Sequence, residues 1–581
     1  MRSLRVALAQ LDVCVGDIDG NTERILDAWR RAHDLGADLV VTTELAITGY
    51  PPEDLLLKPE FVRANLDALD RLTTEGPDGT AVVVGYVGAE QRHDPPDSWD
   101  VTVSARDLHN SAALLTNGEI IGTYNKWRLP NYGVFDEARY FHADDDRLVA
   151  EIAEVPVGVT VCEDLWVEHG PVSEAAAGGA KVVCSLNASP YHRGKRDDRE
   201  RWVRHHATTH DIHLLYVNCV GGQDEVVFDG DSMVATPDGD VVARGAQFDE
   251  DLVVVDLAVE VDDEEERSGQ RAVAPRVAGF PGSRPDLEPH RAPERFGEVA
   301  EVWQALRLGL RDYCHKNGFE TAVLGLSGGI DSALTAALAA DALGADKVTG
   351  VGMPSPYSSD HSLRDAEELT KNLGITWRQI PIEPGMEAFD TMLAETFEGT
   401  EPDITEENIQ ARIRGMLLMA LSNKFGSIVL ATGNKSEMAV GYSTLYGDMA
   451  GGFAVLKDVP KLLVYDLARW HNEHGPGRHG GVIPWNSIEK APSAELKPGQ
   501  TDQDTLPPYE VLDDIIAGYV EEDLGVDEIV ARGHDRTVVR GVVNRIDRAE
   551  FKRRQAPPGV KITDRAFGRD RRVPITSAWR G

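Results

Sequence analysis

The first half of the chain alternates short apolar runs with longer helix-like stretches. Short apolar runs bounded by polar and turn residues are typical of buried β-strands. Strands that alternate with helices build layered folds, so the pattern predicts an α/β domain. The strand-like runs cover residues 5–10, 39–43, 81–86, 111–115, 157–162, 181–186, 214–219 and 252–257.

The second half resumes the same alternation after a break. Between residues 259 and 294 the sequence is first acidic and then rich in Pro, Gly and Arg, a composition typical of a linker. Strand-like runs then occur at 321–326, 347–351, 376–380 and 427–432, and helix-like stretches occur at 333–343 and 363–373. We expect a mostly parallel, doubly wound, Rossmann-like sheet that binds its ligand at the carboxyl ends of the strands. The predicted organisation is a domain at 1–258, a linker at 259–294 and a domain at 295–581.

The length and composition indicate a protein with large buried cores and no membrane-spanning segment. The chain has 581 residues, 42% of them hydrophobic, and domains of roughly 100–200 residues are usual, so two large cores fit. No apolar run approaches the roughly 18 residues of a membrane-spanning helix, and we expect no membrane role. The first residues lead directly into a strand-like run without a signal-peptide pattern, so we expect a cytoplasmic protein. The five cysteines lack Cys-x-x-Cys spacing, which argues against a zinc site or a disulfide framework.

The formal net charge of −38 at pH 7 narrows the choice of partners. Proteins that hold nucleic acid need a basic face, so we expect no nucleic-acid partner. An ATP site in this chain must therefore be basic locally. We also hypothesise that so large an acidic excess reflects a salt-rich cytoplasm, where screening shortens the reach of charge repulsion.

The run Ser327-Gly328-Gly329-Ile330-Asp331-Ser332 lies between a strand-like and a helix-like segment. Two residues without Cβ let backbone N–H groups approach an anion, and the helix start adds its positive dipole end. The run lacks the Gly-Lys-Ser/Thr ending of a Walker A loop, so release of pyrophosphate after attack on the α-phosphate of ATP fits better. Asp331 would carry Mg²⁺, which prefers carboxylate and phosphate oxygens. The plain alternative is a glycine turn with a serine cap.

Glu44, Lys126 and Cys162 each follow a strand-like run in the first half. A thiol attacks as a thiolate, and a nearby ammonium both lowers the thiol pKa and stabilises the oxyanion that forms. A carboxylate can take the thiol proton and hand it to a leaving amine. The alternative is ordinary packing, which we expect for Cys14 and Cys184, because buried cysteines are mostly structural.

The sequence around these three residues reads Thr43-Glu44-Leu45, Asn125-Lys126-Trp127-Arg128-Leu129-Pro130 and Val161-Cys162-Glu163-Asp164-Leu165-Trp166. It resembles the nitrilase or carbon-nitrogen hydrolase family over the first predicted domain. The resemblance implies a four-layer αββα sandwich and an amidase in which Glu44 is the base, Lys126 the electrostatic support and Cys162 the nucleophile that forms a thioester. It also implies that Glu137 supports Lys126 and that glutamine binds at Tyr132, Ser189 and Lys195.

The second half carries four further motifs: Glu407-Asn408-Ile409-Gln410-Ala411-Arg412, Ala431-Thr432-Gly433-Asn434-Lys435-Ser436-Glu437, Gly441-Tyr442-Ser443-Thr444-Leu445-Tyr446-Gly447-Asp448 and Phe551-Lys552-Arg553-Arg554-Gln555. With the glycine loop they resemble the NAD synthetase family of the ATP-pyrophosphatase superfamily, and the domain order resembles its glutamine-dependent form. The resemblance implies that ATP adenylates the carboxylate of deamido-NAD and that ammonia released from glutamine displaces AMP. The products are NAD, AMP, pyrophosphate and glutamate, the last step of NAD biosynthesis, and similar enzymes are homo-oligomers.

The matching positions imply the ligand contacts of the second half. Deamido-NAD is expected at Asn408, Arg412, Glu437 and Lys552, and Mg²⁺ at Asp331 and Glu437, so Glu437 is open between the two roles. Two positions depart from the ammonia-dependent form, in which a lysine is common at Leu445 and a threonine at Ser493. ATP contacts are expected at Gly325, Leu326, Ser327, Gly328, Gly329, Ile330, Asp331, Ser332, Thr432 and Lys461.

Two other functions stay open at this point. The chain could be an amide-forming ligase for another carboxylate, which product analysis with deamido-NAD would reveal. It could also be a degenerate scaffold or sensor that binds nucleotide without turnover, although Cys162, Asp331 and the basic run 552–554 are all present.

Overall fold

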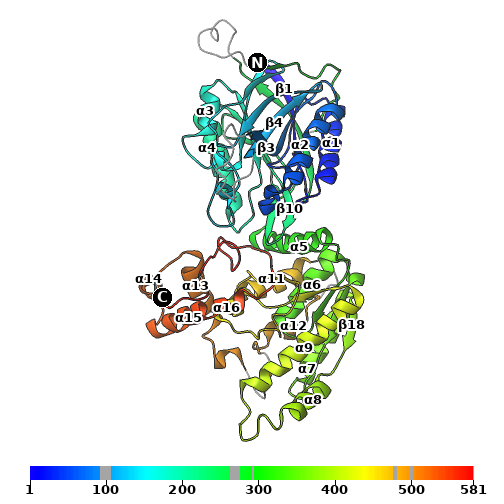
Figure 1. Ribbon diagram of the computed structural model, residues 1–581, viewed down its shortest axis with the longest axis vertical. Coiled ribbons are helices and arrows are strands. Elements are labelled where there is room, and N and C mark those ends of the chain that lie inside the picture. Colours follow the sequence, from blue (N-terminus) through cyan, green and yellow to red (C-terminus); the bar gives the residue numbers. More distant parts are fainter. Residues whose placement is uncertain are drawn as a thin grey trace. The chain divides into compact units, whose positions relative to one another are not determined.

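The computed structural model describes residues 1–91, 106–261, 275–288, 290, 293–475, 481–493, 495–497 and 501–579. The chain forms two compact units (Figure 1). One contains Met1–Gln223 and Val227–Arg295, and the other contains Asp224–Val226 and Phe296–Gly581. Among the described residues, no helix combines the length and the apolar character that crossing a bilayer requires.

The first unit is built on two sheets that face each other. The strand order is β14-β1-β2-β3-β4-β5 in one sheet and β13-β12-β9-β8-β7-β6-β15 in the other. Central neighbours such as β1 and β2 or β7 and β8 are parallel, whereas β4 pairs antiparallel with β3 and β5. The first sheet comprises β1 (Arg2–Gln10), β2 (Leu39–Val41), β3 (Ala81–Gln91), β4 (Arg106–Thr116), β5 (Glu119–Asn125) and β14 (Asp251–Val259). The second comprises β6 (Val149–Ile152), β7 (Val155–Val161), β8 (Val182–Asn187), β9 (His213–Asn218), β12 (Met233–Ala235), β13 (Val241–Arg244) and β15 (Arg276–Val277).

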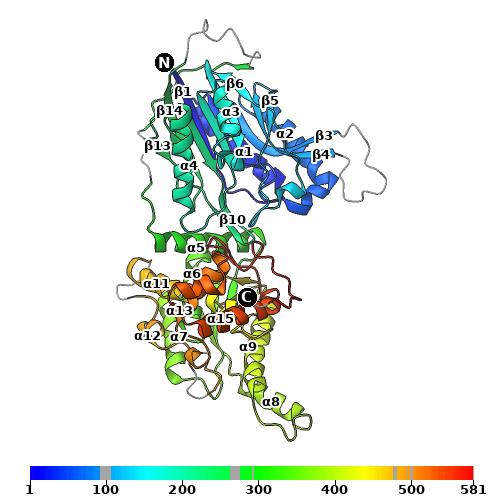
Figure 2. The same cartoon turned by 90° about the vertical axis from the view of Figure 1, so that its left-hand side faces the viewer.

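Side-chain alternation along the strands explains the layers. Leu4, Val6 and Leu8 of β1 pack between the two sheets, and Ala7 and Ala9 face the opposite side. On that side lie helices α1 (Ile18–Asp34) and α2 (Pro59–Glu75), while α3 (Pro171–Ala177) and α4 (Lys195–His210) cover the outer face of the other sheet. Figure 1 shows the two helix pairs on opposite sides of the sheets, and Figure 2 turns α3 and α4 toward the viewer. The predicted αββα sandwich is confirmed.

The described residues of the expected linker are held on the first unit. Strand β15 extends the seven-stranded sheet by pairing with β6. Asp38 accepts hydrogen bonds from the Phe280 N–H at 2.9 Å and from the Arg284 guanidinium at 2.6 Å. Because Asp38 is fully buried, its charge needs a partner, and Arg284 supplies it.

The second unit is built on one sheet with the strand order β18-β17-β16-β19-β20. All four neighbouring pairs are parallel. Helix α9 packs on one face, where Ile413 and Leu418 contact Val323, Val351 and Val429, and α6 also contacts the sheet. The predicted parallel α/β domain is confirmed. Its strands are β16 (Ala322–Gly325), β17 (Val348–Gly352), β18 (Thr376–Gln379), β19 (Ile428–Ala431) and β20 (Phe453–Ala454).

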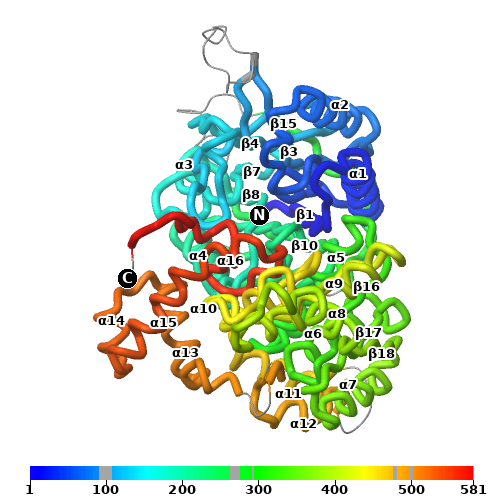
Figure 3. The backbone as a smooth tube through the Cα atoms, turned by 60° about the horizontal axis from the view of Figure 1, so that its bottom comes forward, coloured from blue at the N-terminus to red at the C-terminus, as the bar shows by residue number. Residues whose placement is uncertain are grey.

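Twelve helices of the described residues surround this sheet or follow it. Helices α13, α14 and α15 share a separate apolar cluster built on Leu512, Ile529 and Val543, and Figure 3 shows them together at one end of the unit. The helices are α5 (Glu298–Lys316), α6 (Ile330–Leu343), α7 (Asp360–Leu373), α8 (Glu383–Leu393), α9 (Ile404–Phe425), α10 (Lys435–Val440), α11 (Lys461–His474), α12 (Trp485–Glu489), α13 (Tyr509–Ile516), α14 (Val526–Ala531), α15 (Arg536–Arg548) and α16 (Glu550–Arg553).

Candidate active sites

The first site gathers three side chains at strand ends of the two facing sheets. Glu44 lies three residues after β2, Lys126 directly follows β5 and Cys162 directly follows β7. All three side chains are buried. The fold therefore brings together the three residues that the sequence singled out, although they are far apart along the chain.

Lys126 is bonded to two carboxylates. Its Nζ donates to Oε1 of Glu44 at 2.7 Å and to both carboxylate oxygens of Glu137 at 2.8 and 3.0 Å. Tyr50 also donates its hydroxyl to Glu137, at 2.8 Å. Glu137 thus contacts the same ammonium as Glu44, the arrangement that the family resemblance implies.

Two further donors hold Glu44, and sequence reasoning missed both. The Asn110 side-chain amide donates to Oε1 at 2.7 Å, and the Ala188 N–H donates to Oε2 at 2.9 Å. Asn110 lies within β4 and Ala188 directly after β8, so only the folded chain places them at Glu44. These bonds fix the orientation of the carboxylate.

The electrostatics differ from the sequence expectation at Cys162. Burial raises the pKa of its thiol well above the ordinary value, the charge of Glu44 adds to this, and Lys126 opposes it. Burial alone would lower the pKa of Lys126, but the carboxylates of Glu137 and Glu44 outweigh burial and raise it well above its ordinary value. The resting site therefore holds a neutral thiol beside an ammonium, and a base is needed before the thiol can attack.

The residues expected to hold glutamine lie around this cluster. The Tyr132 hydroxyl donates to the carboxylate of Glu163 at 3.0 Å, and the Lys195 Nζ lies 3.8 Å from the centre of the Trp166 ring. A thiolate at Cys162 would raise the pKa of both Tyr132 and Lys195, so both residues lie near the sulfur. Burial lowers the pKa of Lys195, and the neighbouring Arg199 lowers it further.

Ser189 is buried one residue beyond Ala188. Its N–H donates to the side chain of Asn218 at 2.9 Å, and its carbonyl accepts from Arg199 at 3.0 Å. Arg199 in turn pairs with the buried Asp229 at 2.7 Å. This network fixes the backbone that carries Ser189.

The second site lies at the carboxyl end of β16. The strand ends at Gly325 and α6 begins at Ile330, so the glycine run forms the predicted turn between strand and helix. Gly328 has φ +76°, and a Cβ on it would lie 2.2 Å from the Ser362 carbonyl oxygen. Only glycine fits there. The Ser487 hydroxyl donates to the Gly328 carbonyl at 2.9 Å, which holds the turn in place.

A cavity of about 310 Å³ opens over this turn. It is lined by seven of the eight loop residues expected to contact ATP, Gly328 being the exception, and by Thr432, Glu437 and Lys461. Ser493 lines it too. Sequence reasoning missed two further cations of the lining, Arg414 and Lys490. They lie in α9 and directly after α12, outside the motifs quoted above for the second half.

Asp331, Lys461 and Glu437 form a charged group inside this cavity. The Lys461 Nζ lies 2.5 Å from Oδ2 of Asp331 and 3.3 Å from Oε1 of Glu437. Asn434 donates to the other oxygen of Asp331 at 2.8 Å. Burial raises the pKa of Glu437 to about 8, Lys461 opposes this rise and Asp331 adds to it. The cationic group between two carboxylates marks a position where positive charge is stabilised.

Three residues expected to contact deamido-NAD are bonded to a neighbouring loop. Among the cavity-lining residues that the structure describes, Asn408, Arg412 and Lys552 are missing. Asn408 accepts from the Thr444 hydroxyl at 2.9 Å, Arg412 donates to the Leu445 carbonyl at 3.3 Å, and Lys552 donates to the carbonyls of residues 441 and 443 at 2.8 and 2.7 Å. The loop 441–448 that they hold contributes part of the cavity wall.

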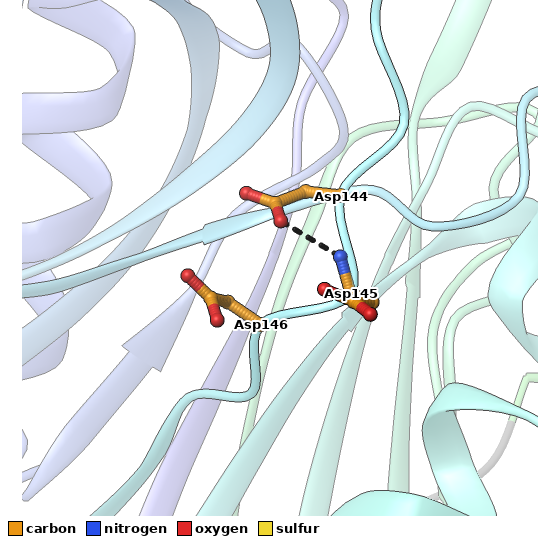
Figure 4. Close-up of side chains that lie close together, drawn as sticks. All are labelled: Asp144, Asp145 and Asp146. Carbon is orange, nitrogen blue, oxygen red and sulfur yellow. Dashed lines mark hydrogen bonds between the residues drawn. The ribbon is translucent and has the colours of Figure 1, made fainter.

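A separate acidic group lies in the first unit. The carboxylates of Asp144, Asp145 and Asp146 lie within 4.8 Å of one another. Figure 4 shows the Asp145 N–H donating to the Asp144 side chain, at 2.7 Å, and Asn125 donates to Asp144 at 2.9 Å. Asp145 and Asp146 are exposed, and such groups are common without a metal. We assign the group no metal.

The two halves of the chain match two different protein families. Residues 5–262 match the carbon-nitrogen hydrolase family, and residues 302–556 match the NAD synthase family.

Two curated relatives are similar over the whole chain. The glutamine-dependent NAD(+) synthetase of Thermotoga maritima is 46% identical and covers 100% of both chains. That of a Synechocystis species is 44% identical and covers 99% of both.

Solved structures agree with these similarities. The glutamine-dependent NAD+ synthetase of Acinetobacter baumannii in complex with ADP has a TM-score of 0.73 at 40% identity, and the match covers 100% of this chain and 99% of that one. The glutamine-dependent NAD(+) synthetase of Cytophaga hutchinsonii has a TM-score of 0.80 at 22% identity, and the match covers 99% of this chain and 98% of that one. At this identity the match supports the fold alone.

Proposed function

The chain belongs to the glutamine-dependent NAD(+) synthetase family, and we propose how its two sites divide the reaction. It is a carbon-nitrogen ligase that uses glutamine as the nitrogen donor and ends NAD biosynthesis. The observation that carries the residue-level proposal is the buried group of Glu44, Lys126 and Cys162 in one unit, together with a cavity over a glycine turn in the other.

At the first site, Glu44 takes the proton of the Cys162 thiol as sulfur attacks the amide carbon of glutamine. A C–S bond forms, and Lys126 stabilises the negative charge that develops on the amide oxygen. The C–N bond then breaks, Glu44 returns the proton to the leaving nitrogen, and ammonia leaves a thioester. Water activated by Glu44 hydrolyses the thioester to glutamate. The raised pKa of the thiol supports a base-dependent step.

Glutamine itself would be held by the groups around this cluster. Its α-carboxylate suits the ammonium of Lys195, and its α-ammonium suits the carboxylate of Glu163, which Tyr132 orients. Ser189 would contribute to the same pocket. Support for these roles comes from the bond between Tyr132 and Glu163 and from the position of Lys195 over the Trp166 ring.

At the second site, the carboxylate of deamido-NAD attacks the α-phosphorus of ATP and pyrophosphate leaves. Ammonia then attacks the activated carbonyl carbon, the C–O bond to AMP breaks, and the amide of NAD forms. The turn from Gly325 to Ser332 would hold phosphate groups through its N–H groups and the start of α6. Thr432 and Lys461, which line the same cavity, would complete the ATP contacts.

Mg²⁺ fits this cavity, because Asp331 and Glu437 offer the oxygen donors that it prefers. The two carboxylates already stabilise one positive charge, the Lys461 ammonium. When bound there, it would neutralise charge on the phosphates of ATP. Glu437 would be a metal ligand in this proposal. Asn408, Arg412 and Lys552 would bind deamido-NAD through the loop 441–448 that they hold.

Exchange of labelled pyrophosphate into ATP tests the adenylation step. We expect exchange only when deamido-NAD is present, because only the bound carboxylate can form the adenylate reversibly. Exchange that other carboxylic acids support equally well would favour a ligase with another substrate, and exchange that is absent under all conditions would favour a nucleotide sensor.

We also propose a cytoplasmic homo-oligomer. The five cysteines are free thiols, four of them buried, which suits a reducing compartment. Light scattering during size-exclusion chromatography measures the subunit number, and a single subunit would contradict the oligomer.

A further inference from the structure

We propose that Asp164 is a positioning residue for the glutaminase reaction, because its carboxylate joins the backbone after Lys126 to the backbone before Cys162. This inference rests on the proposed function of the first site. Asp164 is fully buried and lies two residues beyond the nucleophile, in the short 3-10 helix Cys162–Leu165. None of the roles assigned above uses it.

The two oxygens of this carboxylate serve two different segments. Oδ1 accepts from the N–H groups of Trp127 at 3.2 Å and Arg128 at 3.0 Å, the two residues that follow Lys126. Oδ2 accepts from the Val161 N–H at 3.0 Å, directly before the nucleophile, and from the Tyr124 hydroxyl at 2.7 Å. One side chain therefore spans the ends of β5 and β7, which belong to different sheets.

A local capping role would not account for this arrangement. A cap of the 3-10 helix needs only the bond from the Val161 N–H, which lies three residues before Asp164. The other three donors come from β5 and from the segment after it. Because these donors flank Lys126, the bonds tie the position of the ammonium to the position of the thiol.

The nucleophile also needs support from outside its own turn. Cys162 has φ +47°, a left-handed conformation that is uncommon for residues with a side chain and is kept only where surrounding contacts impose it. Lys126 is bonded to Glu44 and Glu137, and its backbone belongs to a different segment from that of the thiol. Asp164 connects these two segments directly on either side of Lys126 and Cys162.

The carboxylate is suited to this task in its ionised form. Four donors point at its two oxygens, and an oxygen that carried a proton would lose acceptor capacity. Burial raises the pKa of Asp164 to about 6, while the Val161 N–H, the Tyr124 hydroxyl and the charge of Lys126 hold it down. At neutral pH the group therefore accepts all four bonds.

The test is Asp164→Asn in the full-length enzyme, assayed with glutamine and with ammonia as alternative nitrogen sources. Asparagine keeps the shape but replaces one acceptor oxygen by a donor. Since a misplacement of about 1 Å can cost about 100-fold in rate, we expect kcat with glutamine to fall about 10- to 100-fold while KM for glutamine stays within about threefold. Alkylation of Cys162 by iodoacetamide should slow as well, and ammonia-driven synthesis should be unchanged.

Asp38→Asn is the matched control. It makes the same substitution at another fully buried carboxylate of the first unit, before β2, which accepts from the N–H groups of Arg5 and Phe280 and from the Arg284 guanidinium. We expect it to lower the thermal midpoint without changing the ratio of glutamine-driven to ammonia-driven turnover. If Asp164→Asn behaved like this control, or lost both activities equally, Asp164 would not be a positioning residue.

Tyr124→Phe keeps the inference testable if Asp164→Asn does not fold. It removes one of the four donors and leaves the backbone bonds, so we expect a smaller fall of kcat with glutamine and no change with ammonia. An unchanged kcat with glutamine would contradict the inference. Wild-type enzyme assayed in parallel keeps the two questions apart, because absent NAD formation there would contradict the proposed function instead.

Discussion

The Nζ of Lys126 lies 2.7 Å from Oε1 of Glu44, and both side chains are buried. Glu137 bonds to the same ammonium, so Lys126 has a carboxylate partner that does not depend on Glu44. In the proposed mechanism, Glu44 accepts a proton during the reaction, and the second carboxylate would keep Lys126 charged when it does so. In this proposed mechanism, the pair combines general-base and electrostatic roles at one thiol.

Glu44→Gln should abolish the base while keeping the shape of the side chain. Because the buried thiol has a raised pKa, it cannot attack efficiently without a base, and we expect glutamine-driven kcat to fall by about 100- to 10,000-fold. Ammonia-driven synthesis should be unaffected. Steady-state assays with both nitrogen sources decide this, and a glutamine-driven rate near wild type would exclude Glu44 as the base.

Cys162→Ala should lose glutamine-driven synthesis and keep ammonia-driven synthesis at high pH, where more of the ammonia is the free base. Cys184→Ala is the control, because Cys184 is equally buried in the same unit but lies inside β8. We expect this control to keep both activities. Equal loss of both activities in Cys162→Ala would contradict two separable sites.

Lys461→Met should impair adenylation without impairing glutaminase activity. The substitution keeps most of the length of the side chain and removes the charge between Asp331 and Glu437. We expect pyrophosphate exchange to fall at least about 100-fold, since contacts to developing phosphate charge are of that size. Asp331 and Glu437 raise the pKa of Lys461 despite its burial, so wild-type activity should show no loss from its deprotonation up to pH 10. Pyrophosphate exchange at the wild-type rate in this variant would exclude Lys461 as an ATP contact.

His206 should make the first unit sensitive to acid. Burial lowers its pKa from 6.5 to about 4, its Nε2–H donates to the Leu165 carbonyl at 2.9 Å, and its Nδ1 is buried without a hydrogen-bond partner among the described residues. A folded-state pKa below the unfolded one stabilises the fold above pH 6.5, and this stabilisation is lost as the pH falls toward 4. The loss from pH 7 to pH 5 amounts to about 2 kcal/mol.

His206→Gln provides the comparison, because glutamine keeps a donor and does not titrate. We expect the thermal midpoint of the wild type to fall further than that of the variant between pH 7 and pH 5. Parallel curves for the two proteins would contradict the assignment.

The net charge of −38 should make stability depend on salt. Screening at 1 M salt reduces the reach of charges to about 3 Å, compared with about 10 Å at 0.1 M. We expect the thermal midpoint and the activity to rise with KCl. Full stability and activity in low salt would contradict the hypothesis of a salt-rich cytoplasm.

The sequence indicated residues whose position along a strand reveals them. Glu44, Lys126 and Cys162 follow apolar runs, and the glycine turn lies between a strand and a helix, so both sites could be predicted. Asn110 could not, because it lies within β4 and reaches Glu44 only through strand pairing. From the sequence, the nearby ammonium was expected to lower the pKa of the Cys162 thiol. The structure shows that burial raises this pKa instead, and burial depends on the complete fold.

The contacts of the residues expected to bind deamido-NAD were also hard to predict, because they depend on the complete fold. Asn408, Arg412 and Lys552 are recognisable as parts of motifs, but their bonds to the loop 441–448 depend on how α9 and α16 pack around it. Arg414 belongs to no quoted motif, and only the folded cavity draws attention to it.

Turnover with glutamine, ATP, Mg²⁺ and deamido-NAD, in which NAD and glutamate are followed together, tests the account most directly. We expect both products to accumulate in wild-type enzyme and Cys162→Ala to form NAD only when ammonia is added. Glutamate release without any NAD, or NAD formation from glutamine by the Cys162→Ala variant, would contradict it.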